Sequence, residues 1–302
     1  MIYIIGTGRI AIEYVKLLKH EKKEFKVIGN SIDSVNKFEK NTGVKALSGG
    51  VQKHLLSLNK DAYFINCVGV DKLDEVTKSI LKSSPKRILV EKPGFDSINA
   101  ALKEKKYYSK IDNIFIACNR RFFDSVIKLK KILNKETAIS AHFEFNERGM
   151  QIDSKFWTKE ILSNWVFANS IHVIDTVFYL IGQPDQLNIC KGKNKIEWSS
   201  NDIFIGHGVS TNKVYFTFNS NWVSPGSWSI EIKTNNRSYI LNPMEILKCR
   251  NVDGSIETIE KSELDFKPGF NHQLDLFLNS PDKLLTVKDH ISNLEQQKEF
   301  YV

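Results

Sequence analysis

The sequence opens with Met1-Ile-Tyr-Ile-Ile-Gly-Thr-Gly-Arg-Ile-Ala11, where a short apolar run leads into the pattern Gly6-x-Gly8-x-x-Ala11. In such a turn between a strand and a helix, the first glycine permits the tight bend and the second lets the backbone approach a pyrophosphate. The small third residue allows close helix–sheet packing, and the helix start offers unpaired N–H groups and a positive dipole end. The stretch therefore predicts a dinucleotide-binding turn formed by Gly6, Thr7, Gly8, Arg9 and Ile10.

The rest of the first 120 residues continues the same alternation of strand and helix patterns. Helical stripes follow at residues 9–20, 73–80 and 96–102, and apolar, strand-like runs occupy residues 1–5, 25–28, 61–68, 87–90 and 113–118. Strands that alternate with helices indicate a parallel sheet with helices on both faces. We therefore expect an α/β, doubly wound Rossmann domain over residues 1–120.

The pattern changes after about residue 120. A helix is expected over residues 124–133, a strand over 138–145, and a long helix before Gly182. From residue 202 to 260 the sequence alternates with period two between turn signals such as Asn235-Asn236 and Asp253-Gly254. Residues 121–302 are thus expected to form an α+β domain with an antiparallel or mixed sheet.

Composition and charge restrict the class of protein. The chain has 302 residues, of which 41% are hydrophobic and 26% charged, enough for a packed core. The net charge of +8 suits either a lysine-rich surface or an acidic small molecule, and no nucleic-acid-binding motif accompanies it. No apolar run approaches the about 18–20 residues that cross a bilayer. The start lacks the layout of a secretory signal, so we expect a cytoplasmic protein that does not bind membranes.

The four cysteines, Cys67, Cys118, Cys190 and Cys249, form no CxxC pair. Buried free thiols in a reducing compartment are the simplest account of them. Ligand spacing for a structural zinc site is lacking, and no metal is expected.

The choice between NAD and NADP depends on the end of the second strand-like run. An acidic residue about 20 positions after the glycine turn would bind the ribose 2′-hydroxyl of NAD. Asn30 and Ser31 stand there, and neither repels a 2′-phosphate, although no arginine follows to hold one. The cofactor is therefore NAD or NADP, with NADP slightly favoured. Further candidate cofactor contacts are Cys67, Val68, Glu91 and Lys92.

The step Glu91-Lys92-Pro93 follows the strand-like run 87–90. The carboxyl ends of strands in open α/β sheets face the ligand crevice, and the proline restricts the backbone of Lys92 to an extended shape. A lysine beside a nicotinamide ring can polarise a carbonyl or hold a hydroxyl. A lysine exposed at a strand end without function is the alternative interpretation.

Together with a histidine in a helical stretch of the second half, these motifs resemble the Gfo/Idh/MocA family of oxidoreductases over essentially the whole chain. The segment Asn119-Arg120-Arg121-Phe122 is also similar to an Arg-Phe segment of that family. The resemblance implies a second domain with a large open, mostly antiparallel sheet that often forms the oligomer interface. It also implies reversible hydride transfer between NAD(P) and a sugar or related alcohol, with Lys92 as the substrate-positioning lysine and a cis Lys92–Pro93 bond.

The family's second motif, D-x-x-x-H-x-x-D, corresponds to Ala168-x-x-x-His172-x-x-Asp175, so its first aspartate is replaced by alanine. The resemblance implies that His172 relays the proton of the reacting hydroxyl. Asp175 lies one turn away and could orient it, although the resemblance also allows a mainly structural role for Asp175. Asn169 can take over part of the missing aspartate's hydrogen bonding. A helix-packing role without catalysis is the alternative interpretation of His172. Substrate contacts are expected from Asn119, Arg121, Asn169 and Asp175, although Arg121 could instead tie the two domains together. Trp165, Trp222 and Trp228 are expected to be core or interface residues.

The resulting hypothesis is an NAD(P)-dependent sugar oxidoreductase. A nucleotide-linked sugar used in surface polysaccharide synthesis is one candidate substrate. We expect a homo-oligomer formed through the second domain's sheet. Two other hypotheses stay open. The replacement at Ala168 would suit a non-catalytic dinucleotide-binding sensor or scaffold. The net charge alone would suit a nucleic-acid-binding protein, which strong salt dependence of retention would reveal.

Overall fold

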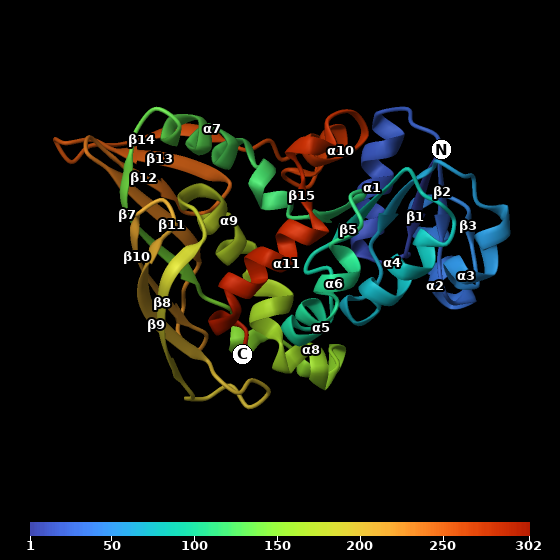
Figure 1. Cartoon of the computed structure of the whole chain (residues 1–302), viewed down its shortest axis with the longest axis horizontal. Coiled ribbons are helices and arrows are strands. Elements are labelled where there is room, and N and C mark those ends of the chain that lie inside the picture. Colours follow the sequence, from blue (N-terminus) through green and yellow to red (C-terminus); the bar gives the residue numbers. More distant parts are fainter. The chain divides into compact units, whose positions relative to one another are not determined.

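The computed structural model describes all residues, Met1–Val302, and the chain divides into two compact units (Figure 1). The first unit comprises Met1–Cys118 and Asp265–Ser292, and the second comprises Asn119–Leu264 and Asn293–Val302. The division at residue 118 lies close to the expected boundary at 120. Residues 265–292 differ from the expectation of a second domain over 121–302, because the chain returns to the first unit there and adds a strand and a helix to it.

The sheet of the first unit has the strand order β15-β6-β5-β4-β1-β2-β3. All its pairings are parallel except that of β15 with β6. Apart from the added β15, this is the strand order of a dinucleotide-binding Rossmann domain. The strands are β1 (Ile2–Ile5), β2 (Phe25–Ile28), β3 (Ala46–Leu47), β4 (Tyr63–Asn66), β5 (Arg87–Glu91), β6 (Ile114–Ala117) and β15 (Leu285–Thr286).

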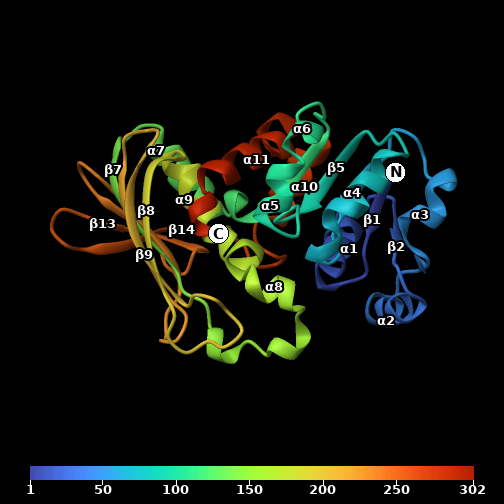
Figure 2. The ribbon, with the colours of Figure 1, turned by 60° about the horizontal axis from the view of Figure 1, so that its bottom comes forward.

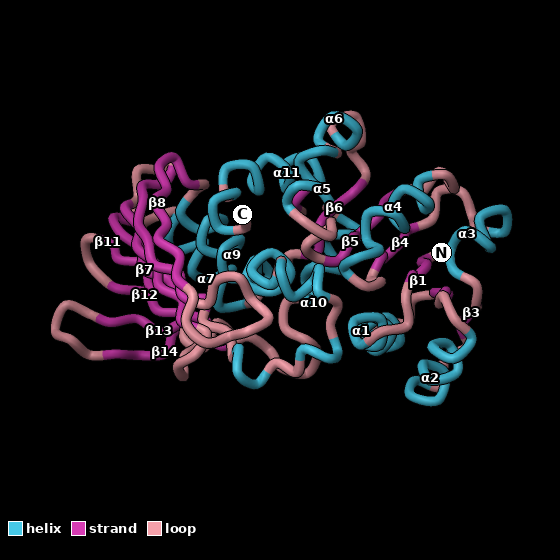
Figure 3. Tube along the Cα trace, turned by 90° about the horizontal axis from the view of Figure 1, so that it is seen from below, coloured by secondary structure: helices cyan, strands magenta, loops and turns pink.

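Helices cover both faces of this sheet, as a doubly wound fold requires. Figure 3 shows α1 and α2 on one face and α4 and α5 on the other. This buries the strands on both sides, which explains why β1 and β6 are apolar at every position. The helices are α1 (Arg9–His20), α2 (Ile32–Thr42), α3 (Gly50–His54), α4 (Leu73–Leu81), α5 (Ile98–Lys103), α6 (Lys105–Tyr108) and α10 (Phe270–Asn279), while α11 (Val287–Gln296) begins in this unit.

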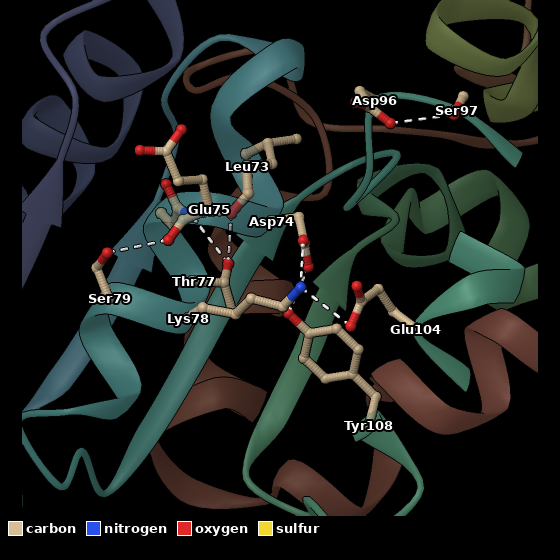
Figure 4. Close-up of polar contacts among 11 residues, drawn as sticks. Leu73, Asp74, Glu75, Thr77, Lys78, Ser79, Asp96, Ser97, Glu104 and Tyr108 are labelled. Carbon is tan, nitrogen blue, oxygen red and sulfur yellow. Dashed lines mark hydrogen bonds and ion pairs between the residues drawn. The ribbon is translucent and has the colours of Figure 1, made fainter. Parts of the chain in front are cut away.

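A polar network joins the helices that follow β4 and β5 (Figure 4). Lys78 on α4 forms ion pairs with Asp74 at 2.8 Å and with Glu104 at 3.0 Å, and the Tyr108 hydroxyl donates to Asp74 at 2.6 Å. Burial and the charge of Asp74 raise the pKa of Tyr108, so its hydroxyl stays protonated and remains a donor. The network fixes α5 and α6 against α4.

The second unit is built on an eight-stranded sheet with the order β14-β13-β12-β11-β7-β10-β9-β8. Only β7 and β10 run parallel, so the sheet is mostly antiparallel, and the expected fold class is confirmed. The strands are β7 (Ala138–Phe145), β8 (Pro184–Gly192), β9 (Ile203–Ser210), β10 (Tyr215–Asn221), β11 (Trp228–Thr234), β12 (Ser238–Leu241), β13 (Ile246–Arg250) and β14 (Ile256–Lys261).

Helices α7 (Asp124–Leu133) and α9 (Ile171–Ile181) pack on one face of this sheet, whereas no helix lies on its opposite face (Figure 2). The covered face carries an aromatic core, because inward positions along β7 and β10 are phenylalanines. Phe143 stacks on Phe218 at 5.3 Å, and Phe300 from the chain's end lies 4.9 Å from the ring of Phe218. A short helix, α8 (Lys159–Ser163), precedes α9.

None of the helices combines the length and the apolar character that crossing a bilayer requires. The cysteines are all free thiols, and three of them are buried as expected. Cys190 is an exception, because it lies on the edge strand β8 and is exposed.

Candidate active site

The glycine turn after β1 has the geometry that its sequence predicts. Gly6 adopts a φ of +117°, a conformation that side chains rarely tolerate. A Cβ placed there would lie 2.7 Å from the carbonyl oxygen of Cys67, just after β4. Gly6 therefore permits both the bend and the close approach of the two strand ends.

Gly8 is a different case, because a Cβ there would meet no atom within 4 Å. It occupies the N-cap position of α1, where no side chain caps the helix and no acidic residue stands in the first turn. The N–H groups at the helix start thus face open space with a positive dipole end, which is the arrangement that binds phosphate groups. The residues present fit a dinucleotide's pyrophosphate, which the backbone of Gly8, Arg9 and Ile10 would hold.

The neighbouring candidate contacts have mixed surroundings. Thr7 packs against Gly29, where an added Cβ would lie 2.7 Å from its methyl group. The Cys67 thiol is buried and donates to the carbonyl of Ile5 at 3.4 Å, and burial raises its pKa well above the usual value. Its side chain therefore belongs to the core, and its backbone, with that of the half-buried Val68, borders the turn.

Asn30 and Ser31 follow β2, as expected, and are exposed. The Ser31 hydroxyl caps α2 by accepting from the N–H of Ser34 at 3.2 Å. The Asn30 carbonyl accepts from the N–H of Gly49 at 2.9 Å. No carboxylate lies at the end of β2. The nearest one that follows in the sequence is that of Asp33, in the first turn of α2.

The Glu91-Lys92-Pro93 step forms a turn at the end of β5. The Lys92–Pro93 bond is cis, as the resemblance implied, and the N–H of Gly94 donates to the Glu91 carbonyl at 3.0 Å. Because β1, β4 and β5 are parallel neighbours, Gly6 and Lys92 lie at the same edge of the sheet. The half-buried Lys92 is thus placed at the ligand-binding edge of the first unit.

Two contacts from the returning segment hold this turn on either side of Lys92. Gln273 on α10 donates to the Tyr14 hydroxyl at 2.9 Å, and Tyr14 donates to the Glu91 carboxylate at 3.1 Å. His290 on α11 donates from Nε2 to the carbonyl oxygen of Pro93 at 2.9 Å. Burial raises the pKa of Glu91, while the charges of Lys267 and Lys92 oppose that shift. No sequence motif indicates these supports, because Gln273 and His290 lie nearly two hundred positions from the turn and Tyr14 lies within an apolar helix stripe.

In the second unit, Arg121 and Asp175 contact each other. The Arg121 Nε and Nη2 atoms donate to the two carboxylate oxygens of Asp175 at 2.8 and 2.6 Å, and both side chains are buried. The charge of each side chain is therefore balanced by the other, and neither needs a ligand to explain its burial. Asn119, another expected substrate contact, is also buried, with 4% of its surface exposed.

His172 follows a turn of π-helix over Val166–Ser170, which shifts the register of the helix just before α9. The histidine is half-buried, and its ring lies 5.9 Å from that of Trp228 on β11. Asn169 donates to both carboxylate oxygens of Glu147 at 3.1 and 2.9 Å, and Ser170 donates to the same group at 2.7 Å. A buried carboxylate is therefore present next to Asn169, although position 168 has none.

Glu147 and Asn169 belong to a cavity of about 390 Å³ within the second unit. Trp165, Trp228 and Arg120 also line it. Trp165 and Trp222 are buried, as expected of core residues, and Trp165 borders the cavity as well. The full lining comprises Arg120, Asn146, Glu147, Arg148, Ile152, Trp165, Asn169, Gly226, Ser227, Trp228, Pro243, Met244 and Glu245. Arg120 and Glu147 were not predicted as site residues. Arg120 is the neighbour of Arg121 in the Arg-Phe segment, whereas Glu147 lies in a loop after β7 that carries no motif.

Comparison with known proteins rests on structure. The sequence matches no family model, and no curated protein matches it significantly. An oxidoreductase from Agrobacterium radiobacter in complex with NAD+, L-tartaric acid and magnesium superposes with a TM-score of 0.77 at 13% identity, covering 98% of this chain and 94% of the other.

Two further solved structures resemble the chain over nearly its whole length. A UDP-N-acetylglucosamine 3-dehydrogenase from Acidithiobacillus ferrooxidans has a TM-score of 0.75 at 13% identity, covering 98% and 95% of the two chains. The WlbA dehydrogenase from Bordetella pertussis in complex with NADH and UDP-GlcNAcA has a TM-score of 0.74 at 12% identity, covering 99% and 94%. These structural neighbours are oxidoreductases of the Gfo/Idh/MocA type, and at such identities the likeness establishes the shared fold.

Proposed function

We propose that this protein is an NAD(P)-dependent oxidoreductase that transfers a hydride between the nicotinamide and a hydroxyl or keto carbon of a sugar. Two features at one edge of the sheet carry the proposal. The N-terminus of α1 at Gly8 is uncapped and open to solvent, and Lys92 stands at the end of β5. The first feature suits a pyrophosphate, and the second places an amine where a substrate oxygen is polarised.

The bound nicotinamide would supply a hydride acceptor or donor at its C4 atom. Lys92 donates a hydrogen bond to the substrate oxygen and stabilises the charge that develops there. His172 takes the hydroxyl proton during oxidation and returns it during reduction, as a histidine positioned for general acid–base catalysis does. Glu91, held by Tyr14, fixes the turn from which Lys92 extends.

Cofactor choice follows from the end of β2. With no carboxylate at Asn30 or Ser31, nothing there repels a 2′-phosphate, and NADP remains slightly favoured. A nucleotide-linked sugar is the substrate class we propose, because the net charge of +8 attracts a diphosphate and two structural neighbours are named for or bound to such sugars. Use in surface polysaccharide synthesis would follow from that substrate class.

The uncovered face of the second sheet supports a homo-oligomer. Ile205 on β9 and Tyr215 on β10 project from that face and are 53% and 67% exposed. Exposed apolar side chains on a broad sheet surface are typical of an interface. We propose that a second copy of the chain covers it, which light scattering of the purified protein and of Tyr215→Glu would test.

A second candidate function is cofactor binding without catalysis, as in a redox sensor. It is favoured by Ala168, which is buried and brings no carboxylate to the helix of His172. The buried Glu147 beside Asn169 weighs against it, because it restores a negative group to the same pocket.

The test is a spectrophotometric assay with NAD and NADP across a panel of sugars and nucleotide sugars. The proposal expects turnover with at least one of them, and Lys92→Ala should lower kcat by at least about 100-fold, the range that a positioned catalytic group contributes. Lys103→Ala, which removes an exposed lysine of α5, is the matched control. Tight cofactor binding without turnover on any substrate would favour the sensor, and full activity of Lys92→Ala would overturn the mechanism.

A further inference from the structure

Arg120 is a half-buried cation whose Nε atom is shielded from water and which forms no ion pair with the two nearest carboxylates, those of Glu147 and Glu245. It lies in a 3₁₀ turn over Asn119–Phe122, with its guanidinium carbon 4.5 Å from the ring centroid of Trp228 and 5.6 Å from that of Phe123. The Nε atom has no hydrogen-bond partner. Arginine nitrogens shielded from water are almost always paired, so this side chain has the surroundings of a ligand-binding group.

Partial removal of the Arg120 guanidinium from water disfavours its charged form. Desolvation lowers the pKa of Arg120 to about 10, although the charges of Glu245 and Glu147 act in the opposite direction. The side chain therefore stays charged at neutral pH. Both glutamates line the same cavity and act on the guanidinium through their charge alone, without a hydrogen bond to it. An anion between these groups would supply the missing partner.

The rest of the cavity suits a ligand that combines an anionic group with hydroxyls. The Nε1 atom of Trp165 is a second buried donor without a partner. Glu147 and Glu245 accept hydrogen bonds and therefore suit hydroxyl donors. A cavity of about 390 Å³ is within the size range of small-ligand pockets. Donors for an oxyanion and acceptors for hydroxyls in one pocket are what a sugar with an acidic group requires.

The position of the pocket links it to the reacting carbon. The Trp228 ring contacts the guanidinium of Arg120 at 4.5 Å and the ring of His172 at 5.9 Å. Arg120 and His172 are thus separated by no more than these two distances taken together. At that separation, an anionic group on Arg120 and a hydroxyl at His172 can belong to one and the same sugar.

Resting on the proposed function, we propose that Arg120 binds an anionic group borne by the sugar of the substrate, a carboxylate or a phosphate. The substrate is then a sugar acid or a sugar phosphate, and Arg120 is the residue that selects it over the neutral sugar. A planar guanidinium pairs with either oxyanion through two parallel hydrogen bonds, which makes such selection strong.

Calorimetric binding to the wild-type protein tests this directly. The probes are glucuronate, glucuronamide, glucose 6-phosphate and glucose, with UDP-N-acetylglucosamine and its 6-carboxylate counterpart as a second matched pair. We expect at least one probe with a carboxylate or phosphate on its sugar to bind about tenfold or more tightly than the matched probe without that group. Preference for glucuronate identifies a carboxylate, and preference for glucose 6-phosphate identifies a phosphate. Equal binding of acidic and neutral probes overturns the proposal, whether or not any variant folds.

The variant Arg120→Gln should abolish that preference while leaving the affinity for the neutral probe within about threefold, because only the charge-assisted contact is lost. Arg250→Gln removes an exposed arginine of the same unit and is the control. Retention of the preference in Arg120→Gln overturns the proposal. An anion preference that depends on Arg120, without turnover on any sugar, would contradict the proposed function alone. Turnover of neutral sugars without any anion preference would contradict this inference alone.

Discussion

Arg121 and Asp175 form a two-point ion pair, with N–O distances of 2.8 and 2.6 Å, that joins the turn after β6 to α9. Arg121 has 8% of its surface exposed and Asp175 has 4%, so the pair is largely shielded from water. The Arg121 guanidinium also lies over the Tyr179 ring at 4.8 Å, one turn along α9. These contacts orient the helix that carries His172.

Asp175→Asn should therefore act mainly on stability. Removing one partner of a buried ion pair leaves the other charge uncompensated, which costs about 3 kcal/mol or more of the free energy of unfolding. Urea unfolding measures this loss. Asp185→Asn, in the exposed ion pair with Lys213, is the control and should change the free energy by less than about 1 kcal/mol. An unchanged stability with a raised KM would instead mean that Asp175 contacts the substrate.

The two glycines of the first turn should respond differently to substitution. Gly6→Ala places a Cβ 2.7 Å from the Cys67 carbonyl oxygen at a φ of +117°, so it should lower stability as well as cofactor binding. Gly8→Val adds a side chain where no atom lies within 4 Å, so the melting temperature should change little. Its dinucleotide affinity should fall at least about tenfold, because the side chain fills the space that a pyrophosphate would occupy. Unchanged NADH or NADPH fluorescence titrations for Gly8→Val would contradict the assignment.

Tyr14→Phe should weaken the support of the turn that carries Lys92. It removes the donor to Glu91 and the acceptor of Gln273, both buried. A buried polar group left without its partner costs about 1–3 kcal/mol, which chemical denaturation measures. Since Lys92 follows Glu91, kcat should fall more than KM rises. A loss of stability without any change in kcat would show that Tyr14 serves the core alone.

Glu91 should give the protein a distinctive pH dependence. Burial raises its folded-state pKa above the usual value of 4.5. The stability that this group contributes is therefore fully present below the unfolded-state pKa and is lost as the pH rises through the raised folded-state pKa. Relative to Glu91→Gln, the wild-type protein should lose stability from about pH 4 upward and then level off. Parallel stability curves for the two proteins between pH 4 and 8 would contradict this.

Much of the fold was predictable because its signals are local. The runs at residues 2–5 and 114–117 consist of buried aliphatic and aromatic side chains, as strands covered on both faces must. The period of two in β10 and β11 follows from one covered face. The turn signal Asp253-Gly254 also fell where β13 and β14 are joined.

What could not be predicted depends on contacts between distant segments. Nothing around Gln273 or His290 indicates that this stretch returns to support Lys92, because the hydrogen bonds join residues far apart in the chain. In an ideal α-helix, Ala168 and His172 would lie on the same face. The π-helical turn over Val166–Ser170 changes the helix register between them, so their spacing in the sequence alone does not predict their relative orientation. The Arg-Phe segment predicted Arg121, and not Arg120, as a substrate contact. In the structure Arg121 is buried in an ion pair with Asp175, whereas the Nε atom of Arg120 has no hydrogen-bond partner.

The central claim is that Lys92 and His172 act on one and the same substrate hydroxyl. A double-mutant cycle of kcat/KM with Lys92→Ala, His172→Ala and the double variant tests it most directly. Groups that act as a unit are strongly non-additive, so each single variant should lose at least about 100-fold and the double variant should stay within about tenfold of the slower one. Losses that multiply in the double variant, or a single variant with full activity, would contradict the claim.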